Sequence, residues 1–439
     1  MSFGELFHCK KLRRSARLEI KGMNEIKNRH IEQAGDLGSF TVLPLELKFI
    51  TFSFLSIEEL SILALTSKQM RNIVEVYRCS KSSNQIQPPV TIHDILLSHE
   101  TAFIGLQHFQ QLGLLVKRTT CLYATKERLK IIERIMMQHM CLYSKSCVNA
   151  SMCFSLVYFG KLLNTIIAGW DDAECNRTLI TLSNSPFSNM WKCLQLIVNS
   201  KPGTHSELES HVRYFFRRVF LDPANKLEER GLWLRKILEG WPMVHQARIL
   251  YILYGPLVGG LIQWNDLSEN TIANRNQLFV YFSELGSALQ LLTNYWSDDD
   301  VISVLDELTN LPEEWLAENI SALLFITGNS ISMKYLGSKA INGRIQDISA
   351  LITSSCLVHV KADRSLSNVI TLIQQLCKVI ENPAEKTRFL NEVVLSFKEI
   401  LLDIYEFDDS DDDRFTDMSH IVDAQTQFMT EIIHLAFKH

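Results

Sequence analysis

The sequence is poor in the residues that interrupt regular structure and lacks the cysteine pairs that build metal sites. Of 439 residues, 18 are glycine and 10 are proline, which excludes a collagen-like or low-complexity chain. The ten cysteines include no Cys-x-x-Cys pair, and Cys141, Cys147 and Cys153 stand six residues apart. This spacing does not suit a zinc knuckle. We therefore expect free thiols, as in a reducing compartment.

Long apolar runs are also missing. The longest uncharged stretch, residues 249–265, is interrupted by Gly255-Pro256 and by Gly259-Gly260. A membrane-spanning helix needs about 20 apolar residues, so we expect this stretch to be buried core and the protein to have no membrane partner. The N-terminal residues lack the apolar segment of a secretory signal. We expect a cytosolic or nuclear protein.

Neither sign of charge is in large excess. A net charge of -5 and a pI near 6.2 lack the basic surplus typical of nucleic-acid-binding proteins, so we expect no direct nucleic-acid partner. Residues 211–218 interleave basic and aromatic side chains, a pattern that could suit single-stranded nucleic acid. We predict instead an amphipathic helix with Arg213, Arg217 and Arg218 facing the solvent.

Catalytic motifs are absent as well. The sequence contains no HExxH, P-loop, GxGxxG or GxSxG pattern. Its carboxylate clusters, Asp171-Asp172, Asp298–Asp300 and Glu313-Glu314, are explained by helix N-termini or solvated faces. We therefore predict a protein that is not an enzyme and that binds no cofactor or metal.

What the sequence does contain is helical periodicity. Apolar residues follow a 3.6-residue period in 127–140, 366–380 and 389–404. The best strand candidate, Arg248–Leu253, could equally be a buried helix. No WD40, kelch or leucine-rich repeat is visible. The sequence predicts an all-α protein, and a solenoid-like stack of helical pairs remains open.

Several helix starts are marked by acidic residues or proline. Asp298–Asp300, Pro312 and Pro383 each precede an apolar stripe and predict a helix N-terminus. The most apolar stretch is formed by Trp241–Met243 and Tyr251–Gly260. Either this stretch packs in the core, or Tyr251, Tyr254 and Trp264 line a substrate groove; their exposure distinguishes the two.

Residues 41–76 form a dense apolar block that predicts three short helices. Pro44 occupies a first helical position, Glu46 lies in the first turn, and an apolar face recurs at steps of four, three and four. Its members are Leu43, Leu47, Ile50 and Phe54.

Two caps separate these helices. Ser56 with Glu59 matches a capping box, and Thr66 with Gln69 offers a second cap. Three helices in roughly 35 residues cannot bury their apolar faces alone. Either the rest of the chain or another protein must complete this module.

The ordered residues of this block resemble an F-box. The resemblance rests on Leu43-Pro44-Leu45-Glu46-Leu47, Phe54-Leu55-Ser56, Glu59-Leu60 and Leu63–Lys68, with no gap in the spacing. The sequence departs from the usual pattern at Thr51, Thr66 and Met70.

The resemblance implies a non-catalytic module that binds the adaptor Skp1 and, through it, a cullin–RING core. The residues expected to contact Skp1 are Leu43, Pro44, Glu46, Leu47, Ile50, Phe54, Leu55, Leu60, Leu65 and Met70.

The remainder resembles the body of one member of the F-box family. The similar stretches are Leu112–Arg118, Ala168–Asp171, Trp241–Val244 with Ala247-Arg248, and Asp299–Ser303. Relatives of this kind imply meiotic prophase and a nuclear setting, so we expect a nuclear, or nuclear and cytoplasmic, location. Two hypotheses follow. The chain recruits a protein substrate to a Skp1–cullin–F-box ubiquitin ligase, or it holds Skp1 in a non-proteolytic structural role on meiotic chromosomes.

The sequence accordingly predicts an N-terminal three-helix F-box followed by a large helical body. The expected segments are a flexible basic tail at 1–38, the F-box at 39–78, a linker at 79–90, the body at 91–405, an acidic loop at 406–414 and a C-terminal helix at 415–439.

Overall fold

The structure is a computed structural model that describes residues 37–80, 83, 86, 99–139, 154–185, 189–224, 226–271, 275–406 and 412–437. The three cysteines spaced six residues apart, nearly all of the predicted tail, most of the predicted linker and residues 407–411 of the acidic loop lie outside these ranges. The chain divides into two compact units, Met1–Thr178 and Leu179–His439. The boundary falls inside the predicted body, which therefore contributes to both units.

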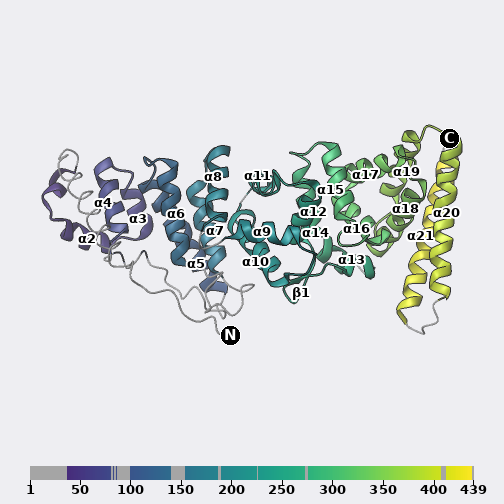
Figure 1. Cartoon of the computed structure of the whole chain (residues 1–439), viewed down its shortest axis with the longest axis horizontal. Helices are drawn as coiled ribbons and strands as arrows, with labels where there is room; N and C mark the ends of the chain where they lie inside the picture. Colours follow the sequence, from purple (N-terminus) through teal and green to yellow (C-terminus); the bar gives the residue numbers. More distant parts are fainter. Residues whose placement is uncertain are drawn as a thin grey trace, which may run out of the picture. The chain divides into compact units, whose positions relative to one another are not determined.

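All regular secondary structure among the described residues of the first unit is helical. Its elements are η1 (Gly38–Val42), α2 (Leu45–Ser53), α3 (Ile57–Leu63), α4 (Lys68–Arg78), α5 (His99–Thr119), α6 (Thr125–His139), α7 (Ser155–Ile167) and the first part of α8 (Asp172–Ser183). The long helix α5 is central, because α3, α4 and α7 all pack against it (Figure 1). The apolar side chains of α5 that face these neighbours, such as Leu112, Leu115 and Val116, are buried.

The second unit is a succession of helices with one small hairpin. It contains α9 (Met190–Asn199), α10 (Ser206–Phe216), the π-helix η3 (Arg217–Leu221), α11 (Leu227–Leu238), α12 (Met243–Tyr254), β1 (Leu257–Val258), β2 (Leu261–Ile262), α13 (Asp266–Glu269), α14 (Arg275–Leu292), α15 (Asp298–Leu308), α16 (Ala317–Thr327), α17 (Asn329–Ile341), α18 (Ile345–Lys361), α19 (Ser367–Val379), α20 (Pro383–Glu406) and α21 (Asp412–Phe437). In the hairpin, Leu257 pairs with Ile262 and Val258 with Leu261, antiparallel.

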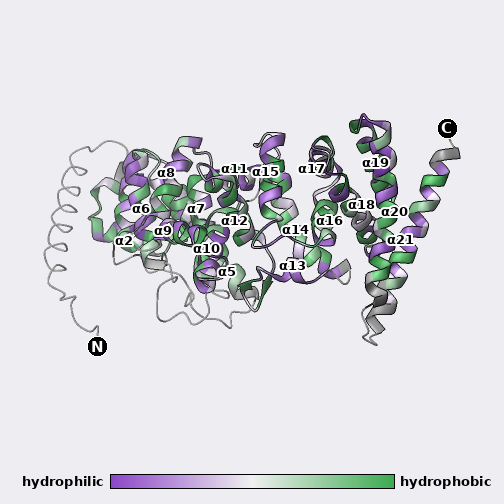
Figure 2. Cartoon of the chain, turned by 45° about the vertical axis from the view of Figure 1, so that its right-hand side comes forward, coloured by the Kyte–Doolittle hydropathy of each residue, from purple (hydrophilic) through white to green (hydrophobic). Residues whose placement is uncertain are grey.

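From α14 onward, each helix packs against the next helix but one. One row runs α14, α16, α18 and α20, and a second row runs α12, α15, α17 and α19. Both hydrophobic and hydrophilic residues occur along each of these helices (Figure 2), as amphipathic packing requires. Two parallel rows of stacked helices are the arrangement of an α-solenoid. The predicted all-α class is confirmed.

The helix predictions were confirmed in part. Ser297 caps α15 in a capping box with Asp300, and α20 begins at Pro383. Arg248–Leu253 lies inside α12 and is helix, not strand. Pro312 does not open a helix, because α16 begins only at Ala317. The segment between Pro312 and α16 instead bonds to another element: the Leu316 N–H donates to the Leu267 carbonyl of α13 at 3.1 Å.

The aromatic region of α12 is core. Tyr251, Tyr254 and Trp264 are all buried, and the rings of Tyr251 and Trp264 stack with centroids 4.8 Å apart. The substrate-groove interpretation of these residues is therefore wrong. The part of the chain that the structure describes has no helix long and apolar enough to cross a membrane.

The prediction of solvent-facing arginines on 211–218 is wrong for Arg213. Its side chain is 3% exposed, and its guanidinium donates to the carbonyls of Ile252 at 3.0 Å and Gly255 at 2.8 Å. These are among the last carbonyls of α12, which have no partner within their own helix. Burial lowers the pKa of Arg213 to about 10, so the group is still cationic at neutral pH. Arg217 is half-buried and pairs with Glu284 at 2.6 Å.

Replacing Arg213 by methionine should lower the free energy of unfolding by about 1–3 kcal/mol, because two buried carbonyls lose their donor. The matched control is Arg388→Met, which removes only an exposed contact to Glu392 at 3.7 Å and should change stability by less than about 0.5 kcal/mol. Urea denaturation of the purified chain measures both. Equal effects would show that the Arg213 bonds contribute nothing specific.

Two buried glycines in the helix rows differ in the space around them, so replacing each by alanine should have opposite effects on stability. A Cβ at Gly286 of α14 would lie 2.6 Å from the Ile326 side chain of α16, whereas a Cβ at Gly337 of α17 would meet its nearest neighbour, Met333, at 3.4 Å. Gly286→Ala should therefore destabilise by about 1–3 kcal/mol through overpacking. Gly337→Ala should be neutral or stabilise by up to about 1 kcal/mol through helix propensity. Thermal unfolding of both variants measures the contrast, and a destabilised Gly337→Ala beside a neutral Gly286→Ala would contradict this packing.

Candidate partner-binding surface of the N-terminal module

The interior of the N-terminal module is an aromatic cluster. The ring of Phe52 on α2 lies 5.5 Å from Tyr77 on α4 and 6.1 Å from Phe40, and Phe49 approaches Tyr77 edge-on at 5.3 Å. Phe52 and Tyr77 are fully buried. Because aromatic pairs of this kind combine apolar burial with a preferred geometry, they fix α2 against α4.

Short polar caps set where each helix of the module begins. The Ser56 side chain accepts the Glu59 N–H at 3.2 Å, and the Glu59 carboxylate accepts the Ser56 N–H at 2.7 Å, which confirms the predicted capping box. The bond from the Ser56 main chain holds the pKa of Glu59 below its usual value. The next cap is Ser67, which accepts the Met70 N–H at 3.1 Å.

The sequence placed two of these boundaries one residue too early. Thr66, which was predicted to cap the third helix, instead donates its hydroxyl to the Leu63 carbonyl at 2.8 Å. Pro44 is the N-cap residue of α2, and the helix begins at Leu45. Thr66 and Ser67 both carry a hydroxyl that can cap a helix, so the sequence pattern alone does not distinguish these adjacent cap positions.

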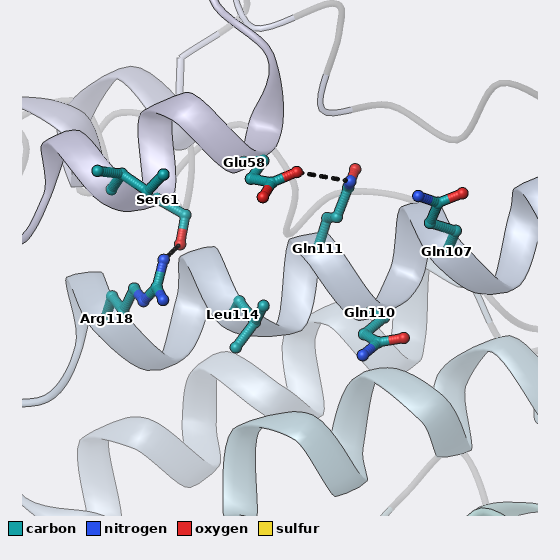
Figure 3. A pocket seen from close by; sticks show the side chains of 8 residues that line it. Glu58, Ser61, Gln107, Gln110, Gln111, Leu114 and Arg118 are labelled. Carbon is teal, nitrogen blue, oxygen red and sulfur yellow. Dashed lines mark hydrogen bonds between the residues drawn. The ribbon is translucent and has the colours of Figure 1, made fainter.

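Helix α5 covers the α3 side of the module. Arg118 donates to the Ser61 hydroxyl at 2.7 Å, and Gln111 donates to the Glu58 carboxylate at 3.5 Å. Figure 3 shows these bonds bridging the two helices. The same residues line a cavity with a volume of about 270 Å³. Residues after the module therefore complete one of its faces.

The outer face of α2 is left uncovered among the described residues. Leu47 and Ile50 lie on α2, and Phe54 is its C-cap residue. The three are 48%, 55% and 83% exposed, and their steps of three and four place them on one side. We call these three side chains the α2 apolar face. A clustered set of exposed large apolar residues on a well-packed module is characteristic of a protein-binding site.

The structure sorts the ten predicted contact residues into three groups. Pro44, Glu46, Leu47, Ile50, Phe54 and Leu65 are exposed, and Leu43, Leu55 and Met70 are half-buried. Leu60 is 0% exposed, because it lies on the inner stripe of α3 with Ile57 and Ala64. We therefore assign Leu60 to the module's interior and remove it from the contact set.

Sequence reasoning overlooked two exposed apolar residues, Val42 and Ile62. Ile62 is 53% exposed, although it sits within a short apolar helix. A signal was present, since Ile62 falls outside the inner stripe of Ile57, Leu60 and Ala64. An apolar residue off the buried stripe of an amphipathic helix is a candidate for contact with another molecule.

The described residues contain no group of three His, Cys, Asp or Glu side chains that could hold a metal ion. The geometry of the module is that of a surface for protein contact, built from a fixed backbone and uncovered apolar side chains.

Comparison with known proteins agrees with this architecture. A family model for the F-box domain matches residues 40–84, and a model described as FBXO47, ARM repeats, matches residues 186–439. F-box only protein 47 of Homo sapiens is 34% identical over 437 residues, covering 97% of this chain and 95% of the human protein. F-box only protein 47 of Mus musculus is 35% identical over 413 residues, covering 91% and 90%. No solved structure matches the chain. An F-box with an uncovered α2 face and a body of stacked helices, together with these matches, places the chain in the F-box only protein 47 family.

Proposed function

We propose that this chain is the substrate-recruiting adaptor subunit of a Skp1–cullin–F-box ubiquitin ligase. F-box proteins are in general non-catalytic adaptors, and the F-box implies Skp1 as its partner. The cullin–RING core would then be joined through Skp1, and the helical body would hold a protein substrate. Such a subunit accelerates a reaction at another protein's active site by proximity.

The observation that carries the proposal is the α2 apolar face. Leu47 and Ile50 on α2, with Phe54 at its C-cap, are exposed on a helix whose other side is fixed by the Phe52–Tyr77 cluster. A partner can therefore bury these side chains without reorganising the module. Stable interfaces bury roughly 1,200–2,000 Å², and a few apolar or aromatic anchors dominate their energy.

The body supports the second half of the proposal. The two helix rows of the second unit expose a long series of adjacent helix faces and ends, as α-solenoids that bind proteins do. The nuclear setting and the link to meiotic prophase rest on the family resemblance alone, and we include them in the proposal on that basis.

Changing Leu47 and Phe54 to alanine together should reduce the Skp1 recovered with the chain by about tenfold or more, because two anchors of the interface are lost. The matched control is Phe103→Ala with Leu122→Ala, which removes two exposed apolar side chains of the same unit away from α2. Quantitative affinity purification from cells measures both, with thermal unfolding to confirm that each variant is folded. Undiminished Skp1 binding by a folded Leu47→Ala, Phe54→Ala variant would refute the surface assignment.

The same purification separates the ligase from the non-proteolytic role. If the chain is a ligase subunit, cullin is recovered with Skp1 and is lost in the α2 variant. Proteins bound to the body should then also persist longer when the cullin is inhibited. Recovery of Skp1 without cullin would instead favour the structural role on meiotic chromosomes.

A further inference from the structure

A second cavity lies in the helical body, between α16, α17, α18 and α19. It has a volume of about 550 Å³, and these four helices are neighbours in the two rows of the second unit (Figure 1). The residues that line it, all in the described part of the chain, include an arginine, a histidine, serines and asparagines but no aspartate or glutamate. Three leucines, a phenylalanine and a glycine complete the lining, so the cavity combines polar and apolar groups and carries no anionic side chain.

The rim of the cavity is rich in hydrogen-bond donors. Arg364, Asn329 and Asn368 are exposed at this rim. The guanidinium of Arg364 has no ion pair or hydrogen bond to another described residue, and only its main-chain N–H is bonded, to the His359 carbonyl at 2.9 Å. The neighbouring acidic residue Asp363 is exposed and does not line the cavity. An unpaired arginine is therefore available to a ligand.

Two helix N-termini end at the same rim. Helix α17 follows Gly328, which has no side chain to cap it, and α19 follows Leu366, which makes no side-chain cap bond. The first main-chain N–H groups of a helix have no partner within it, and the helix dipole adds partial positive charge there. Two such ends beside Arg364 make a strong local preference for an anion.

The base of the cavity offers hydrogen-bond acceptors instead of donors. Ser321, Ser332 and Ser355 all donate their hydroxyl protons to main-chain carbonyls at 2.7–3.0 Å, so only their oxygen lone pairs face a ligand. His359 is 6% exposed, and its Nδ1 lies 2.7 Å from the Ser355 carbonyl. A carbonyl can only accept, so Nδ1 carries the proton.

The other ring nitrogen of His359 is left as an acceptor. Its Nε2 has no partner among the described residues, and the side chain lines the cavity. Burial lowers the pKa of His359, so the ring is neutral at physiological pH and Nε2 keeps its lone pair. A ligand that carries an N–H donor can therefore bond to this acceptor inside the cavity.

A ligand that fits both zones carries an oxyanion for the rim and an N–H donor for the base. We propose that this cavity binds a phosphorylated or carboxylate side chain of the protein that the body recruits, with Arg364 and the first turns of α17 and α19 holding the oxyanion and the peptide N–H groups reaching the acceptors at the base. A peptide supplies both groups within one residue. This inference rests on the proposed function and names the substrate class for it.

Isothermal titration calorimetry of the purified full chain tests the oxyanion site. Sodium phosphate and sodium acetate are titrated separately at an ionic strength held constant with sodium chloride. We expect saturable binding of at least one anion, and Arg364→Gln should weaken it about tenfold or more, since bonds to charged groups are worth that much. Arg388→Gln, an exposed arginine on α20, should leave it unchanged.

Asn368→Asp is a second variant that is expected to fold. A carboxylate in the first turn of α19 favours the helix but repels an anion at the rim, so anion binding should be lost while the melting temperature is kept. If phosphate binds and both variants weaken its binding, the ligand class is a phosphorylated side chain. If acetate binds in the same way, the ligand class is a carboxylate. The proposal is overturned if neither anion binds the folded chain above the chloride background, or if Asn368→Asp binds as the unmodified chain does.

Neither titration involves Skp1 or a cullin. A chain that binds the anion but fails to recover Skp1 would count against the ligase role and leave the cavity assignment standing. A chain that recovers Skp1 and cullin but binds neither anion would count against the cavity assignment and leave the ligase role standing.

Discussion

The constraint on which this structure depends is the width of the apolar stripe on each helix. A single sequential neighbour does not cover such a stripe, so many of the helices also pack against the next helix but one. This pattern holds for α2 with α4 and for α3 and α7 on α5. It also holds along the rows α14–α16–α18–α20 and α15–α17–α19. Stacked helices that bury one another in this way form a continuous core without any sheet.

The same rule explains why the F-box has an open face. Helix α2 is the first α-helix among the described residues, and Phe40 and α4 pack against its aromatic side. Its opposite side therefore keeps Leu47, Ile50 and Phe54 in contact with solvent. Three short helices could not have been stable alone, and α5 supplies the missing cover on the α3 side through Arg118 and Gln111. The contacts that stabilise the module and the proposed Skp1 contact thus involve different faces of it.

Buried polar groups join the helical rows to the segments between them. Arg213 closes the C-terminal end of α12, and the Asn319 amide donates to the carbonyls of Leu267 and Asn270 at 2.8 and 2.7 Å. Each bond links residues at least 39 positions apart in sequence. At the α16–α19 cavity the same kind of bonding occupies the serine donors and leaves acceptors facing inwards. The polar character of that cavity is therefore a product of how the helices assemble.

Local chemistry in the sequence was enough to predict the all-α class, the three-helix module, the capping box at Ser56, the helix start at Asp298–Asp300 and the apolar stripe of α2. Each of these depends on residues within one or two turns of one another. Long-range packing decided that Leu60 is interior, that Arg213 is buried, that the segment after Pro312 is not helical and that Tyr251, Tyr254 and Trp264 form core. Burial of a side chain is set by which distant helix lies over it, and the residue's own neighbours in sequence carry little information about that.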